Sequence, residues 1–211
     1  MPDFVLEFSY DKGLDQYVDY FEGIAKKLDV FGFNVFFEAN EKSMDHYDDT
    51  GNLRLESLNS IAQTVEINTG VKLKYNDGET WYVHAMLFSQ SPIDRLLGYM
   101  FDQFDGALRE SFSMHLLNIR KFSTSDAHFD ALLKHTFFHE LGHCLCLGHN
   151  EDADNLSVMA DFETLVKADA WPDNLVLTYS QEEIEFVKNN PVLAKPGGPN
   201  LPPDSNHNPI V

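Results

Sequence analysis

Apolar and polar residues follow two different periods along the chain, and each period predicts a different kind of element. Residues 4–10 alternate large apolar residues with mostly polar ones, which is typical of a strand. Residues 14–31 place apolar side chains three or four positions apart, which predicts a helix with one apolar face. By the same criteria, further strands are expected at residues 33–38, 71–75, 80–88, 98–101 and 114–119.

Long helices are expected mainly in the second half of the chain. The stretch 46–70 is ambiguous, although its apolar spacing favours a helix. A longer helix is predicted from a cap at Ser123 or Ser125 to about residue 147. Because strands come mostly early and helices mostly late, the pattern predicts an α+β fold.

The last predicted helix marks the end of the folded part. Ser180 and Glu183 have the spacing of a capping box that opens this helix, and Pro191 stops it. Residues 191–211 contain six of the nine prolines and little that is apolar, so we expect a disordered or surface-draped tail. The chain is therefore divided into one compact domain, 1–190, and the tail, 191–211.

Composition narrows the classes of partner. Apolar residues make up 43% of the chain and charged residues 23%, which is enough apolar material for a core. The 15 basic residues face 34 acidic ones, and the net charge of −19 disfavours nucleic acid and anionic membranes. The N-terminus shows no secretory signal and no stretch predicts a membrane span, so the compartment is left open. We expect a monomer.

The candidate metal-binding and catalytic residues lie in one segment, 139–149. His139 and His143 are four residues apart, so a helix places them on one face, where two imidazoles can bind one metal ion. Glu140 lies at the edge of that face and can take a proton from a water on the metal. His149 reaches the same ion only if the helix ends first, and Gly148 is the residue best suited to bend the chain. Three neutral nitrogen ligands leave a fourth position open, as in catalytic sites.

The pattern H-E-L-G-H-C-L-C-L-G-H at 139–149, followed by S-V-M at 157–159, resembles the metzincin zinc endopeptidases and, within them, the matrixin branch. The resemblance is strong at 139–159 and weak elsewhere in the domain. It implies these roles: His139, His143 and His149 as ligands of one catalytic Zn²⁺, Glu140 as general base, and Met159 as the residue of the Met-turn beneath the zinc.

The resemblance also implies an architecture. The upper lobe would hold a twisted, mostly parallel sheet with helices, and the lower lobe would be small and irregular, with the Met-turn and the C-terminal helix. A protein or peptide substrate would lie between the lobes and pair as an added strand with the edge near residues 98–101.

Several residues depart from the family pattern. Cys146 stands where the family has a glycine in a left-handed turn, at a cost of about 1 kcal/mol. If His149 failed to reach the metal, Glu151 or Glu163 would be a substitute ligand. Only His115 matches a ligand of the family's structural zinc, while Tyr99 replaces another, so we expect no structural zinc and an ordinary half-buried His115.

Other metal-ligand residue types have simpler interpretations. The run 126–130 looks like a structural-zinc motif but falls within the active-site helix, and we interpret it as a coincidence. His135 could line the cleft, although a surface position on the helix is favoured. Cys144 is expected to pack as a small hydrophobe. For calcium, 45–49 is the place to look, but no loop has convincing ligand spacing.

The sequence thus predicts a zinc-dependent endopeptidase that acts on protein substrates through an activated water and Glu140. The alternative is a zinc-binding interaction module without proteolytic activity. The presence of Glu140 favours the enzyme, because a binding module does not need a proton acceptor at that position.

Overall fold

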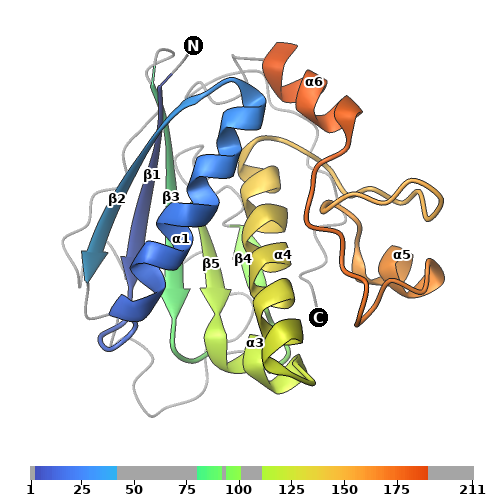
Figure 1. Cartoon of the computed structure of the whole chain (residues 1–211), viewed down its shortest axis with the longest axis horizontal. Coiled ribbons are helices and arrows are strands. Elements are labelled where there is room, and N and C mark those ends of the chain that lie inside the picture. The colour runs from blue at the N-terminus through green and yellow to red at the C-terminus, as the bar shows by residue number, and fades with distance from the viewer. Residues whose placement is uncertain (1–2, 42–79, 92–93, 101–110, 190–211) are drawn as a thin grey trace.

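A five-stranded sheet forms the centre of the molecule. The computed structural model describes residues 3–41, 80–91, 94–100 and 111–189. The strands lie in the order β2-β1-β3-β5-β4, and only β4 runs antiparallel to its neighbour (Figure 1). Their bounds are Asp3–Tyr10 for β1, Asn34–Glu41 for β2, Thr80–Phe88 for β3, Gly98–Met100 for β4 and Ser111–His115 for β5. The molecule therefore combines helices with a mostly parallel mixed sheet. This agrees with the predicted α+β class and with the mostly parallel sheet that the resemblance implied.

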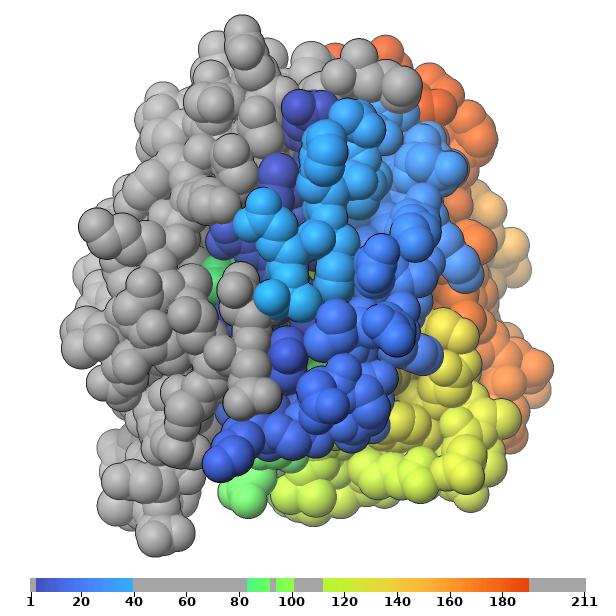
Figure 2. Space-filling view, turned by 60° about the vertical axis from the view of Figure 1, so that its left-hand side comes forward, coloured from blue at the N-terminus to red at the C-terminus, as the bar shows by residue number. Residues whose placement is uncertain are grey.

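Helices α1 and α4 cover one face of this sheet, and α5 and α6 lie beside it (Figure 1). In the space-filling view of Figure 2, α1 and the chain that follows it form the surface between β2 and the region of α3 and α4. The helices are α1 Val18–Ala25, α3 Leu116–Phe122, α4 Asp126–Cys144, α5 Phe162–Lys167 and α6 Gln181–Asn189; short 3-10 turns, Asp15–Tyr17 and Lys26–Phe31, flank α1.

Aromatic rings join the sheet to its covering helices. Phe8 on β1 packs against Phe21 of α1 with ring centroids 4.7 Å apart, and Phe21 packs against Phe137 of α4 at 5.2 Å. All three side chains are fully buried. Large buried rings dominate the energetics of a core, so this row fixes α4, which carries the metal-ligand motif, against the sheet.

Most of the predicted elements are confirmed within the described residues. The strands expected at 4–10, 33–38 and 80–88 correspond to β1, β2 and β3. The helix expected at 14–31 is helical from Asp15 to Phe31, but only its centre, Val18–Ala25, is an α-helix. The capping box is present, since the Ser180 backbone N–H donates to Glu183 at 2.6 Å and the Glu183 N–H donates to the Ser180 hydroxyl at 3.2 Å.

Two predictions about elements were wrong, and one helix was not predicted. The strand expected at 114–119 ends at His115, and α3 follows at once, because Leu116 and Ile119 turn inward at helical spacing while Leu117 is exposed. Helix α5 was not predicted; its first turn is capped by the Asp161 carboxylate, which accepts from the Thr164 N–H at 2.8 Å. The long helix ends at Cys144, three residues earlier than expected.

Other predictions fall outside the described residues. These are the helix at 46–70, the strand at 71–75, the calcium position at 45–49, and the tail at 191–211. In the part of the chain that is described, no helix has both the length and the apolar character needed to cross a bilayer.

Candidate metal centre

The C-terminal half of α4 supplies the first two imidazoles. His139 is buried and His143 is half-buried. The Nδ1 of His139 lies 2.9 Å from the carbonyl oxygen of Val158, and the Nδ1 of His143 lies 2.9 Å from that of Leu147. A carbonyl oxygen only accepts, so both Nδ1 atoms carry the hydrogen. In the neutral rings the lone pair is therefore on Nε2, the atom available to a metal.

A Schellman turn ends α4 and redirects the chain toward the third imidazole. The Cys146 N–H donates to the His143 carbonyl, and the Leu147 N–H donates to the Gly142 carbonyl, both at 2.9 Å. Cys146 takes the left-handed position, with φ of 65°, that glycine usually occupies in this motif. The left-handed turn expected at Cys146 is confirmed, whereas Gly148 has no such conformation and the bend assigned to it was misplaced.

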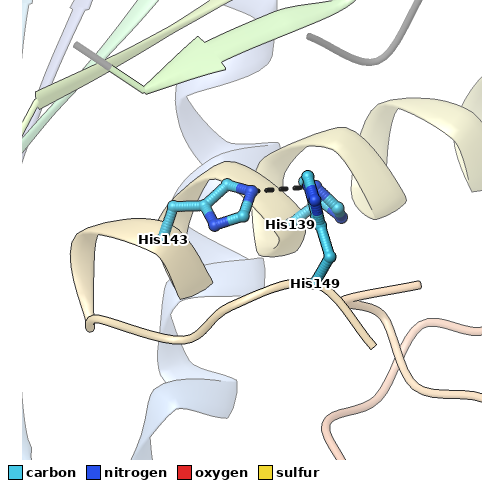
Figure 3. Close-up of side chains that lie close together, drawn as sticks. All are labelled: His139, His143 and His149. Atoms are coloured by element: carbon cyan, nitrogen blue, oxygen red, sulfur yellow. Dashed lines mark hydrogen bonds between the residues drawn. The ribbon is translucent and has the colours of Figure 1, made fainter. Parts of the chain in front are cut away.

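The chain after this turn is anchored beside Met159 and Ala160. The Asn150 N–H donates to the Met159 carbonyl at 2.8 Å, and Asn150 forms a parallel bridge with Ala160. These contacts fix the backbone directly after His149. The third imidazole is thereby directed toward the first two although it lies outside the helix (Figure 3).

His139, His143 and His149 converge on one point. One ligand atom from each lies within 4.8 Å of the others, and the ring centroids are 4.7 to 5.2 Å apart (Figure 3). The Nε2 atoms of His139 and His143 are 3.1 Å apart. Two facing lone pairs repel each other unless a cation lies between them, and two nitrogens at about 2.0–2.1 Å from a tetrahedral Zn²⁺ are about 3.3 Å apart. The arrangement therefore fits a shared metal ion.

Burial keeps His139 in the form that binds metals. Desolvation lowers the pKa of His139 well below its usual value, and the neighbouring imidazoles of His143, His135 and His149 lower it further. The Val158 carbonyl acts in the opposite direction but does not reverse the shift. The ring is therefore neutral near pH 7, as a metal ligand must be.

Glu140 lies under β4. Burial raises the pKa of its carboxyl to about 8, although the carboxylate accepts a hydrogen bond from the backbone of Met100, which acts in the opposite direction. The strand approaches closely because residue 98 has no side chain. A Cβ on Gly98 would lie 2.6 Å from the Thr136 methyl carbon and 2.7 Å from Cγ of Glu140. The Glu140 side chain is thus held between α4 and β4.

Met159 lies beneath the same turn of α4. Its side chain is fully buried, and a Cβ on Gly142 would overlap its sulfur atom. The Met159 N–H donates to the hydroxyl of Ser157 at 3.1 Å. Gly142 lies between the two helical histidines in sequence, so the thioether packs under the part of the helix that carries them.

The other candidate residues have different positions. His135 was expected on the surface but is fully buried, because the segment around Val176 covers that face of α4. His115 was expected to be half-buried and is fully buried. Cys144 is buried in the main core, as predicted. Glu151 and Glu163 are exposed and do not belong to the histidine cluster.

Sequence reasoning missed the groups that orient the histidines. The carbonyls of Val158 and Leu147 hold the two ring hydrogens, and the backbone of Met100 contacts Glu140. Every residue has the same backbone groups, so the sequence does not indicate which of them will contact a side chain. The one indication is Gly98, whose lack of a side chain lets β4 approach Glu140.

Comparison with known proteins identifies the fold. No family model matches the sequence, and no curated protein matches it. Among solved structures, the archaemetzincin of Methanopyrus kandleri is similar to this chain with a TM-score of 0.57 and 14% identity, over 90% of this chain and 95% of that protein. A zinc-dependent peptidase of Methanocorpusculum labreanum shows a TM-score of 0.48 and 12% identity, over 86% and 99%. The chain thus shares the archaemetzincin fold.

Proposed function

We propose that the protein is a zinc-dependent endopeptidase with His139, His143 and His149 as its zinc ligands. The observation that carries this proposal is the convergence of the three imidazoles within 4.8 Å, two of them with their Nδ1 hydrogens donated to backbone carbonyls. Such carbonyl partners orient metal-binding histidines and fix their tautomer. The fold shared with archaemetzincin supports the same class of site.

The donor set favours zinc among the common metals. Three imidazole nitrogens and no carboxylate suit Zn²⁺ better than Mg²⁺ or Ca²⁺, which bind oxygen ligands. When bound, zinc polarises the scissile carbonyl and acidifies a water molecule. Three protein ligands leave a position open for that chemistry.

Glu140 is the proposed general base. Burial raises the pKa of its carboxyl to about 8, which makes the ionised carboxylate a stronger base than a solvated one. In that form it would accept a proton from the attacking water and return it to the leaving amine. The contact with the Met100 backbone holds the carboxylate in place. Such positioning reduces the reorganisation needed when the proton moves.

Strand β4 is the proposed docking edge for substrate. It is one of the two outer strands of the described sheet, and it lies against Glu140. An extended peptide that pairs with this edge would pass beside the histidine cluster. We further propose a metzincin-type site, because Met159 packs under the helix that carries the first two ligands. The matrixin branch stays a prediction of the motif alone.

Zinc content and cleavage, measured together, test this function. We expect one zinc per chain in the wild type and in Glu140→Gln, with casein cleavage slowed about 10²- to 10⁴-fold in the variant. The matched control is Glu182→Gln, the same change at an exposed glutamate of α6, which should cleave normally. A wild type without zinc would reject the proposal. Zinc in all three proteins with cleavage in none would indicate the binding module instead.

A further inference from the structure

His135 is a buried histidine that the proposed mechanism does not use. It lies one turn before His139 on α4, with the ring centroids 5.8 Å apart, and it is fully buried. Its Nδ1 is 2.9 Å from the Val176 carbonyl oxygen, so this nitrogen carries the hydrogen and donates it. Its Nε2 is buried and has no hydrogen-bond partner among the residues that the structure describes.

This environment is an unfavourable place for a histidine unless its N–H matters. A buried acceptor without a partner costs stability, and a leucine of similar size would fill the same space without that cost. The contribution that only a polar side chain can make here is the bond to Val176.

That bond closes a loop of hydrogen bonds around the metal centre. Two residues after Val176, the Thr178 carbonyl accepts from the Val158 N–H at 2.9 Å. The Val158 carbonyl in turn accepts from Nδ1 of His139 at 2.9 Å. His135 and His139 are thus connected through two segments that lie beside α4, the Met-turn and the chain at 176–179.

A second tie joins the same segment to α4. The Tyr179 hydroxyl donates to the Phe138 carbonyl at 2.6 Å, and this side chain also packs on the Phe138 ring with centroids 6.1 Å apart. The segment is therefore attached to α4 at two points, through Val176 and through Tyr179. Thr178, whose carbonyl binds Val158, lies between these two points. Movement of this segment would displace the carbonyl that orients His139.

We propose that His135 is a positioning residue for the zinc site: its Nδ1 hydrogen, donated to Val176, holds the segment that aligns the Val158 carbonyl with His139. This inference rests on the proposed zinc function. It assigns His135 no contact with substrate or metal.

Replacing His135 by asparagine or by glutamine separates the role of its Nδ1 hydrogen from that of its side-chain volume. The side-chain nitrogen of Asn can take the position of Nδ1, whereas that of Gln lies nearer the position of Nε2. We expect His135→Gln and His135→Leu to weaken Zn²⁺ binding about tenfold or more, measured against a chelator, while His135→Asn retains most of the affinity. The visible spectrum of bound Co²⁺ should change in the Gln and Leu variants and remain like the wild type in Asn.

His128→Leu is the matched control. His128 is a second buried histidine on α4, but its Nδ1 accepts from the Thr124 N–H at 3.1 Å and it does not belong to the loop of hydrogen bonds. This variant should keep the wild-type Zn²⁺ affinity and Co²⁺ spectrum. Wild-type affinity and spectrum in all three His135 variants would overturn the positioning role alone, as would an equal loss in His128→Leu. A wild type that binds neither Zn²⁺ nor Co²⁺ would overturn the proposed function as well.

Discussion

Cys146 adopts the left-handed conformation that ends α4 and turns the chain so that His149 lies near His139 and His143. Its φ of 65° closes the Schellman turn, and the paired bonds from Cys146 and Leu147 to α4 compensate for the strain. A left-handed non-glycine residue costs about 1 kcal/mol, which two hydrogen bonds of about that value each offset. The missing family glycine therefore does not keep His149 away from the site.

Gly98 is the residue that lets β4 lie against Glu140. In Gly98→Ala the added methyl would overlap Thr136 and Glu140, so the strand must move away from α4. Because small displacements of catalytic groups are costly, we expect kcat/KM for a peptide substrate to fall about 10- to 100-fold.

The control for this change is Gly23→Ala in α1, where an added Cβ meets nothing within 4 Å. Alanine in a helix is favoured over glycine by about 0.5–1 kcal/mol, so this variant should be slightly more stable and equally active. Unchanged kinetics in Gly98→Ala would show that β4 does not constrain Glu140.

Helix α6 and the turn at 157–159 are both bound by one carboxylate. Glu183 accepts from the Ser180 N–H and also from the Ser157 hydroxyl, each at 2.6 Å, and Ser157 in turn accepts from the Met159 N–H. Helix α6 therefore supports the turn that contains Met159 through a side chain that also caps the first turn of the helix.

Two alanine variants separate the cap from this support. Ser180→Ala removes only a capping hydroxyl and should lower the free energy of unfolding by about 1 kcal/mol. Glu183→Ala removes the acceptor of both the Ser180 N–H and the Ser157 hydroxyl. It should lower the free energy of unfolding, measured by urea titration, by about 2–3 kcal/mol. We expect weaker zinc retention only in Glu183→Ala. Equal effects of the two variants would mean that the bond to Ser157 contributes nothing.

The whole molecule should lose stability in acid partly through one histidine of the sheet. His115 on β5 is fully buried, contacts the Ser113 hydroxyl at 3.0 Å and stacks on Phe88. Burial lowers the pKa of His115 to about 4, despite the opposing effect of the Gln90 carbonyl.

The sign of the effect follows from the two protonation states. Above pH 6.5 the histidine is neutral in both the folded and the unfolded chain. As the pH falls from 6.5 to 4, the unfolded chain takes up a proton that the folded chain does not, so up to about 3 kcal/mol of stability is lost. Urea unfolding of the wild type and of His115→Gln between pH 7.5 and 4 measures this loss. Because Gln does not titrate, the variant should lose less of its free energy of unfolding over the same pH range. Parallel curves for the two proteins would contradict the prediction.

The sequence alone determined what depends on short-range spacing. Alternation predicted β1, and the four-residue separation of His139 and His143 placed both on one helix face, since helical geometry is a local property. The capping box at Ser180 is equally local, and it was predicted with the correct partners.

Tertiary structure decided what depends on residues that are distant in the chain. The position of His135 in the helical pattern is compatible with an exposed face of α4. It is buried because the segment around Val176, 41 residues later in the chain, packs on that face. The orientation of His139 depends on a backbone carbonyl nineteen residues away, and Glu140 depends on a strand that precedes the helix. Backbone groups are alike at every position, so their long-range pairing is set by how the elements pack and leaves no pattern in the sequence.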